Sequence, residues 1–151
     1  MTPSGRYKKP LFTFESGDTY LGEWVGEEED GFGIFTSSIG NRYEGEFRNG
    51  LKHGQGKYFF KSGDSYEGDY KDGKMTGRGV YRWASGHVYE GGLLEGKQQG
   101  LGWMKWASGD SYYGEWSNDK KQGLGVFVWK DGDVHVGKYR DGAIEGEGVY
   151  F

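Results

Sequence analysis

The chain has 151 residues, of which 31 are glycine and 18% are aromatic, with two prolines and no cysteine. This composition excludes a collagen-like triple helix, which needs far more proline, a disordered glycine linker, which lacks aromatic residues, and a disulfide scaffold or cysteine-ligated zinc site. The net charge of −4 disfavours unaided binding to nucleic acid, because such binding needs a basic face.

The N-terminal segment lacks the pattern of a targeting sequence. Residues 1–15 include Arg6, Lys8 and Lys9 but no apolar stretch of signal-peptide length. No run in the chain approaches the ~20 apolar residues of a membrane-spanning helix. We expect residues 1–9 to be an N-terminal extension, because they match no later part of the chain, and residues 10–151 to form one repeat array. A cytoplasmic, cytoskeleton-associated protein is the default expectation.

A repeat of 23 residues runs through the chain. A Tyr-x-Gly element begins at Tyr20 and recurs at this spacing up to Tyr112, and a Gly-x-Gly element that begins at Gly31 recurs up to Gly146. These elements and two further registers contain 28 of the 31 glycines. The sequence therefore predicts a partial first unit followed by units over residues 18–40, 41–63, 64–86, 87–109 and 110–132 and a partial unit over 133–151.

Each unit is predicted to form two β-strands. In the second full unit, Tyr43, Gly45 and Phe47 alternate with charged residues. This period of two is typical of a strand with an aromatic face and a charged face. A second alternating stretch covers residues 54–60. Helix is disfavoured throughout, because each interior glycine costs about 1 kcal/mol in a helix.

Turn residues separate the predicted strands at regular places. Asn49-Gly50 begins the connection inside a unit, and Ser62-Gly63-Asp64 forms a tight turn between units. Glycine suits both places because it adopts positive φ without a steric cost. Connections this short predict that neighbouring strands are antiparallel.

Gly22 and its equivalents lie between two aromatic residues on one face of a strand. Glycine weakens a strand unless something packs over it, and the expected occupant is an aromatic ring from the adjacent strand. Each repeat is therefore predicted to lay its rings over the glycines of the neighbouring repeat, in a ladder of hairpins. A lone hairpin is barely stable in water, so the stacking of neighbours supplies the stability.

The chain resembles the MORN repeat family over roughly residues 10–151. The motifs that carry the resemblance are Tyr-x-Gly-acid-aromatic stretches and one His-Gly-x-Gly element: residues 20–24, 43–47, 66–70 and 112–116, and residues 53–56. The resemblance implies an all-β fold, an elongated single-layer array of antiparallel β-hairpins. Family members occur in ciliary radial spokes, parasite cytoskeleton and myosin-associated complexes, which implies a scaffold.

Two units depart from the family pattern. The unit over residues 87–109 has Gly92 and Leu93 in place of the acid and the second aromatic residue, and Met104 in place of another ring. The last unit has His135 in place of the tyrosine. Leu93 and Met104 make the ladder more adaptable there, which suits a surface that accepts an apolar anchor. The alternative is that both are ordinary core substitutions.

No catalytic, cofactor or metal site is predicted. The three histidines, His53, His87 and His135, occupy different registers and match no metal motif, so we interpret them as structural polar residues. The Gly-x-Gly pairs lack the third glycine and the following helix of a dinucleotide site. Acids such as Glu44 and Glu46 recur in nearly every unit, whereas a catalytic pair would normally be unique.

The aromatic face is the predicted binding surface. A groove lined by Trp and Tyr suits a protein or peptide partner with apolar anchors. The candidate residues lie near the middle of the array: Tyr66, Tyr70, Trp83, Tyr89, Leu93, Met104, Trp106, Tyr112 and Trp116.

Two kinds of function remain open. The first is a non-enzymatic scaffold that binds a partner in this groove or forms a homodimer through the C-terminal strand, residues 149–151. The second, which the family resemblance also implies, is peripheral binding to anionic phospholipid headgroups. The predicted outward face carries basic and acidic residues in nearly equal number, so their effects on an anionic surface nearly cancel. A third possibility is the accessory array of a larger enzyme.

Overall fold

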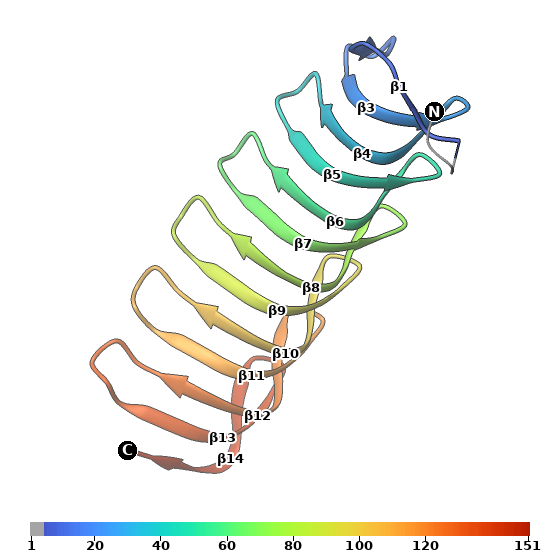
Figure 1. Cartoon of the computed structure of the whole chain (residues 1–151). Helices are drawn as coiled ribbons and strands as arrows, with labels where there is room; N and C mark the ends of the chain where they lie inside the picture. The colour runs from blue at the N-terminus through green and yellow to red at the C-terminus, as the bar shows by residue number, and fades with distance from the viewer. Residues whose placement is uncertain (1–4) are drawn as a thin grey trace. The chain divides into compact units, whose positions relative to one another are not determined.

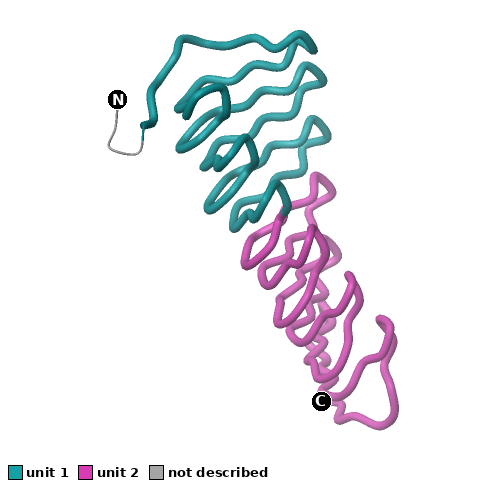
Figure 2. Tube along the Cα trace, turned by 90° about the vertical axis from the view of Figure 1, so that its right-hand side faces the viewer, with its two compact units in different colours: residues 1–74 teal, residues 75–151 magenta. Residues whose placement is uncertain are grey.

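The computed structural model describes residues 5–151, and these residues form β-strands and turns. The chain divides into two units, the first running to Lys74 and the second spanning Met75–Phe151 (Figure 2). The all-β fold and the antiparallel hairpins predicted from the repeat are confirmed. Within the described part of the chain there is no helix with the length and apolar character that a membrane crossing needs.

In the first unit, each long strand is hydrogen-bonded to the next one in the sequence (Figure 1). Two short strands, β1 and β2, both pair with β3. The strands are β1 (Tyr7–Lys8), β2 (Phe12–Thr13), β3 (Thr19–Val25), β4 (Glu28–Thr36), β5 (Arg42–Arg48), β6 (Leu51–Phe59) and β7 (Ser65–Lys71).

The second unit repeats this arrangement, with strand order equal to chain order. A first strand of seven residues alternates with a longer second strand. The strands are β8 (Lys74–Arg82), β9 (Val88–Leu94), β10 (Lys97–Lys105), β11 (Ser111–Ser117), β12 (Lys120–Val128), β13 (Val134–Arg140) and β14 (Ala143–Tyr150).

The two predicted kinds of turn are both present. Inside a repeat, Asn49 and Gly50 take left-handed conformations with φ of 51° and 79°. Between repeats, Gly63 has φ of 98° and its N–H donates to the Phe60 carbonyl at 3.0 Å. Most side chains would be strained at such φ values, so the turn chemistry predicted from the sequence determines where each strand ends.

Glycines line up across the strands in a continuous row. Gly33 is paired with Gly22 on one side and with Gly45 on the other, and Gly45 is paired in turn with Gly56. This row is the floor on which the tyrosines lie. The ring of Tyr43 packs on Gly56, where there is no room for a Cβ. We call this side of the sheets the ladder face and the opposite side the reverse face.

The prediction that each ring covers a glycine of the neighbouring repeat is wrong. Tyr20 covers Gly33, and Tyr112 covers Gly125, in each case the glycine of the second strand of its own hairpin. The reason is the register, which pairs Gly22 with Gly33 two residues beyond Tyr20. The side chain lies along its own strand, and its hydroxyl donates to the carbonyl three residues on.

This tyrosine hydrogen bond recurs in five successive repeats. The hydroxyl-to-carbonyl distances lie between 2.7 and 3.0 Å. The second aromatic residue of the next repeat then packs edge-on against four of these rings, as between Tyr20 and Phe47 at 5.1 Å and between Tyr112 and Tyr139 at 5.1 Å. Contact between successive repeats therefore depends on this second ring, whereas the tyrosine closes its own hairpin.

The edge next to β3 differs from the rest. Tyr7 pairs with Trp24, and Phe12 pairs with Tyr20, so the chain is already part of the sheet before residue 10. Pro10 lies between the two short strands and cannot donate to the sheet, which explains why the edge is split. The Lys9 ammonium lies 4.4 Å from the Trp24 ring centre. β1 lies before residue 10 and yet pairs with β3. The division into an extension over residues 1–9 and an array over residues 10–151 therefore stays a proposal.

Candidate functional site

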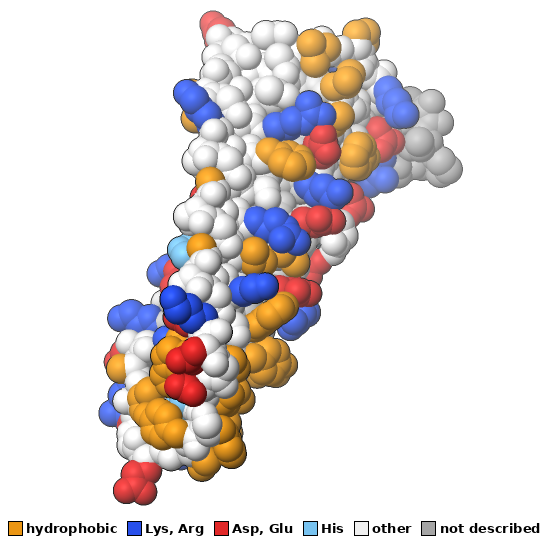
Figure 3. Space-filling model, turned by 90° about the vertical axis from the view of Figure 1, so that its left-hand side faces the viewer, with side chains coloured by type: hydrophobic (Ala, Val, Ile, Leu, Met, Phe, Trp, Pro, Cys, Tyr) orange, Lys and Arg blue, Asp and Glu red, His pale blue; other side chains and the backbone are white. Residues whose placement is uncertain are grey.

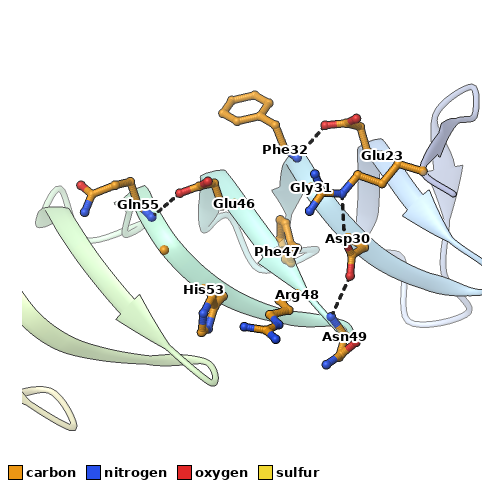
Figure 4. A pocket seen from close by; sticks show the side chains of 12 residues that line it. Glu23, Asp30, Gly31, Phe32, Glu46, Phe47, Arg48, Asn49, His53 and Gln55 are labelled. Carbon is orange, nitrogen blue, oxygen red and sulfur yellow. Dashed lines mark hydrogen bonds and ion pairs between the residues drawn. The ribbon is translucent and has the colours of Figure 1, made fainter. Parts of the chain in front are cut away.

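A bulge interrupts the pairing within several hairpins, and a carboxylate fills it. Between β5 and β6 the register shifts after Gly45, and the Glu46 carboxylate accepts a hydrogen bond from the Gln55 N–H at 2.6 Å (Figure 4). Glu23 accepts in the same way from the Phe32 N–H at 2.9 Å. These repeated acids therefore stabilise the backbone, because each satisfies an N–H that the bulge removes from the ladder.

The cavity in Figure 4 lies around these bulges in the first unit and has a volume of about 660 Å³. Several of its polar side chains contact one another or the backbone. Arg6 forms an ion pair with Asp30 at 2.9 Å, and Asp30 also accepts from the Asn49 N–H at 3.3 Å. Such contacts brace adjacent hairpins, so we do not assign a ligand to this cavity.

The histidines have structural contacts, as the sequence indicated. His87 accepts from the Ala107 N–H at 2.9 Å, the contact that Asp110 makes one repeat later with the Lys130 N–H. His135 is fully buried, and its Nδ1 lies 2.9 Å from the Tyr139 hydroxyl. His53 Nδ1 lies 3.9 Å from the Asp72 carboxylate. His87 and His135 therefore make hydrogen-bond contacts within the fold, whereas His53 Nδ1 has no hydrogen-bond partner among the described residues.

A second hollow lies on the ladder face of the second unit. Its volume is about 430 Å³, and we call it the ladder-face groove. Its lining combines aromatic rings, two methionines, a leucine and two polar side chains: Met75, Tyr81, Trp83, Tyr89, Leu93, Gly96, Gln98, Met104 and Asp119.

The groove lies where aromatic rings are missing. In other repeats a ring packs edge-on against the ladder tyrosine, as Trp116 does against Tyr112 at 5.2 Å. At this register beside Tyr89 stands Leu93, which is smaller. Met104 likewise replaces the ring that faces a ladder tyrosine in other hairpins, because it is paired directly with Tyr89. The two substitutions singled out in the sequence therefore border the same hollow.

The nine predicted site residues divide into two groups. Four line the groove: Trp83, Tyr89, Leu93 and Met104. The other five do not, and four of these are buried in the ladder: Tyr66, Tyr70, Tyr112 and Trp116. Trp106 is half-buried and packs against Phe127 at 5.6 Å. Of the groove residues, Trp83 is partly exposed, and its ring packs at a tilt against Tyr81, with the ring centres 4.6 Å apart.

Sequence reasoning missed five residues of the lining: Met75, Tyr81, Gly96, Gln98 and Asp119. Met75 and Gln98 occupy the same position in successive repeats, 23 residues apart. No repeat has a glycine or an aromatic residue at this position. Residues at this position face the second aromatic position, as Gln98 is paired with Leu93. The residue type at this position varies from repeat to repeat, and that variation is the only sequence signal for it. The strand pairing, which the sequence does not give, places the position on the ladder face.

Lysines fill the same variable position elsewhere. The Lys52 ammonium lies 5.4 Å from the Tyr58 ring centre, and the Lys121 ammonium lies 5.1 Å from that of Phe127. Burial lowers the pKa of both lysines. Their stems and charges cover the rings, whereas Met75 and Gln98 place no cation beside the rings of the ladder-face groove.

The reverse face is less uniformly charged than predicted. In the first unit its central row is apolar at Leu21 and Ile34 but polar from β5 to β7, with Glu44 opposite Lys57 and Lys57 3.8 Å from Glu67. In the second unit the same row is apolar apart from Glu90, and Trp103 is paired with Tyr113, each about half exposed. Hydrophobic side chains also gather toward the C-terminal end of the surface drawn in Figure 3. The alternation with charged residues seen in residues 42–48 therefore does not extend to the middle of β10 and β11.

A family model described as MORN repeat matches six consecutive stretches, residues 20–42, 43–65, 66–88, 89–111, 112–134 and 135–151. Its boundaries begin at the tyrosine, two residues after the units predicted above. No curated protein matches this chain significantly.

Solved structures of two TCP domains are similar to the chain. The first is the SAS-4 (dCPAP) TCP domain in complex with a proline-rich motif of Ana2 (dSTIL) from Drosophila melanogaster, with 11% identity and a TM-score of 0.50 over 95% of this chain and 88% of that one. The second is a mutant TCP10 domain of Danio rerio CPAP, with 14% identity and a TM-score of 0.31 over 91% and 80% of the two chains. At these identities the likeness to the first concerns the fold alone, and the second carries no argument.

Proposed function

This chain belongs to the MORN repeat family, and on that basis we propose that it is a non-enzymatic interaction scaffold whose second unit binds an extended, proline-containing peptide in the ladder-face groove. The observation that carries the proposal is the coincidence of Leu93 and Met104 in one hollow beside the partly exposed Trp83. Smaller, flexible side chains next to an aromatic wall form the kind of site that receives an apolar anchor.

The chemistry of the lining favours an extended ligand. Proline-rich segments adopt a preformed extended helix and dock in grooves lined by aromatic rings. Tyr81 and Trp83 provide such a wall, and Gln98 adds an amide near the floor. The fold neighbour bound to a proline-rich motif supports the choice of this peptide class.

Peptide capture by the full chain tests the proposal. An immobilised panel of proline-containing peptides, and the same peptides with proline replaced by alanine, would be screened against the native protein. Truncation of an anchor typically costs about 2 kcal/mol or more, so Trp83→Ala is expected to weaken capture roughly thirtyfold. Trp129→Ala is the matched control, because Trp129 occupies the same register outside the groove.

Leu93→Tyr gives a second, opposite test. This change restores the usual ring beside Tyr89 and fills the groove, so the fold is retained while the peptide is excluded. Equal capture by the native protein, Trp83→Ala and Leu93→Tyr would refute the groove as the binding site. Thermal unfolding of each variant, followed by circular dichroism, separates loss of binding from loss of fold.

Binding to anionic phospholipid headgroups is the second candidate. Two of the lysines, Lys52 and Lys121, lie over aromatic rings, and acidic residues outnumber basic ones by four, so the net electrostatic attraction to an anionic membrane is weak. Flotation with phosphatidylserine vesicles is expected to leave the protein unbound. Salt-sensitive recovery with the vesicles, together with unchanged capture by Trp83→Ala, would favour the lipid function instead.

Two further proposals concern assembly and location. Residues 149–151 have exposed apolar side chains next to the β14 edge, and pairing of two copies there would give a dimer, which sedimentation at micromolar concentration would detect. A cytoplasmic, cytoskeleton-associated location, with cilia and flagella among the sites to examine, is proposed from the family and would be tested by imaging tagged protein.

A further inference from the structure

The carboxylate that fills the bulge is missing from two repeats, where Gly92 and Lys138 occupy its register, and only at Gly92 is there no side chain. The register three residues after the ladder tyrosine holds Glu23, Glu46 and Glu115 in three repeats. Each of these three glutamates accepts a backbone N–H at 2.6–2.9 Å. The repeat that begins at Tyr89 has Gly92 at this register, and so has no side chain at all there.

The place of the missing carboxylate is open. A Cβ on Gly123 would touch the Glu115 carboxylate, and a Cβ on Gly54 would touch that of Glu46, whereas a Cβ on Gly100 would meet no atom of the described residues within 4 Å. Gly92 itself lies close to the carbonyl of Gln99, which leaves no room for a Cβ. This hairpin therefore keeps a place for a carboxylate but cannot supply one without a backbone shift.

A backbone donor faces this place. Leu124 donates to the Glu115 carboxylate, and Leu101 is its equivalent one repeat earlier. The register between β9 and β10 breaks between Gln98 and Gly102, so Leu101 has no ladder partner on β9. By equivalence with Leu124, the Leu101 N–H points toward β9. There Gly92 has no side chain that could accept the hydrogen bond.

The surroundings combine a positive charge with apolar surface. Exposed Arg78 is paired directly with Gly92 across the strands, so both lie on the reverse face. Leu101 is 51% exposed, and the paired rings of Trp103 and Tyr113 lie next to it along β10 and β11. A carboxylate at this place would meet the guanidinium and the N–H together, and an adjacent apolar side chain would cover the exposed rings.

We propose that the reverse face of β9–β11 binds a partner segment in which an acidic residue is followed by an apolar one, with the carboxylate at the Gly92 bulge and the apolar side chain on Leu101, Trp103 and Tyr113. The partner thus supplies in trans the carboxylate that Glu23, Glu46 and Glu115 supply in cis in their own repeats. This surface is separate from the ladder-face groove, so the scaffold binds two segments, one on each face of the second unit.

Nuclear magnetic resonance of the full ¹⁵N-labelled chain tests this inference. The probe is the blocked peptide acetyl-Glu-Leu-Trp-amide, and the control probe has Gln in place of Glu. The glutamate peptide is expected to shift the Leu101 amide downfield and to bind about tenfold more tightly than the glutamine peptide. The Leu124 amide is the internal control, because Glu115 already accepts its hydrogen bond.

Substitutions that preserve the strands identify the charges involved. Arg78→Gln is expected to weaken binding of the glutamate peptide about tenfold without affecting the glutamine peptide. Glu90 lies on the same face opposite Trp103, so Glu90→Gln is expected to strengthen binding two- to threefold by removing a repulsion. Leu93→Tyr, which fills the ladder-face groove, is expected to leave binding unchanged and so separates this surface from the first.

Two results would overturn the inference. One is equal affinity for the glutamate and glutamine peptides, since the carboxylate would then have no specific place. The other is binding of the glutamate peptide that leaves the Leu101 amide resonance unshifted. An affinity for this peptide that is the same in Arg78→Gln as in the native chain would count equally against the inference. Thermal unfolding of each variant checks that the strands are retained, and the two-peptide comparison on the native chain needs no variant at all.

Discussion

The side chain of Tyr43 lies directly on Gly56, in the paired strand of its own hairpin. A Cβ added to Gly56 would come within 2.5 Å of the phenol carbon that carries the hydroxyl, and the hydroxyl itself donates to the Glu46 carbonyl at 2.8 Å. The ring therefore packs on the glycine backbone while its hydroxyl is fixed by a hydrogen bond. A side chain at position 56 would displace the ring and break that hydrogen bond.

Gly56→Ala is expected to destabilise the protein by about 1–3 kcal/mol, because the new methyl group displaces the Tyr43 ring. Backbone propensity alone predicts the opposite sign, since glycine in a strand is roughly 0.5–1 kcal/mol less favourable than alanine. Urea denaturation measures the difference. Lys57→Ala, on the exposed face of the same strand, is the control and is expected to change stability by less than about 1 kcal/mol.

The ladder tyrosines make stability depend on alkaline pH. Burial raises the pKa of Tyr89 and of Tyr112 to about 12 from the ordinary value of 10.0. The folded state holds these phenols neutral, so their contribution is fully present below pH 10 and is lost as the pH rises toward 12.

Urea midpoints measured between pH 8 and pH 12 would follow this loss. Tyr112→Phe cannot ionise at this position, so its stability should fall less steeply than that of the native protein between pH 10 and pH 12. Identical slopes for the two proteins would contradict the assignment of this titration to the buried ladder.

Glu115→Ala is expected to destabilise the fold by about 1 kcal/mol and to speed hydrogen exchange at the Leu124 amide, because it removes the carboxylate that accepts this N–H at 2.6 Å. Glu147→Ala, an exposed acid on β14, is the control. If the Leu124 amide exchanged at the same rate in both variants, the carboxylate would have no role in closing the bulge.

His135→Tyr is expected to stabilise the last hairpin by about 1 kcal/mol. His135 occupies the ladder tyrosine register and is fully buried, and its Nε2 is buried without a hydrogen-bond partner among the described residues. A tyrosine would instead reach the carbonyl three residues on, as Tyr112 reaches Glu115 at 3.0 Å. Differential scanning calorimetry measures the change, and a lower melting temperature would show that this hairpin is shaped for histidine.

The sequence by itself determined the strands, their antiparallel order and their turns. The alternation around Gly45 and the Asn49-Gly50 turn are local signals, because side-chain direction and positive φ depend only on near neighbours in the chain. Repetition every 23 residues then extended one hairpin to the whole array. The same regularity drew attention to Leu93 and Met104, which depart from the pattern and do border the groove.

Only the tertiary structure decided which residues meet. The bulge shifts the register within each hairpin, so Tyr20 covers Gly33 of its own repeat, and Glu46 reaches the Gln55 N–H nine residues on. For the same reason Met75 and Gln98, which belong to no aromatic or glycine register, enter the ladder-face groove. These contacts depend on how many residues each strand has between two paired positions, because a bulge adds residues to one strand only. The hydrophobic pattern of the sequence does not specify that number.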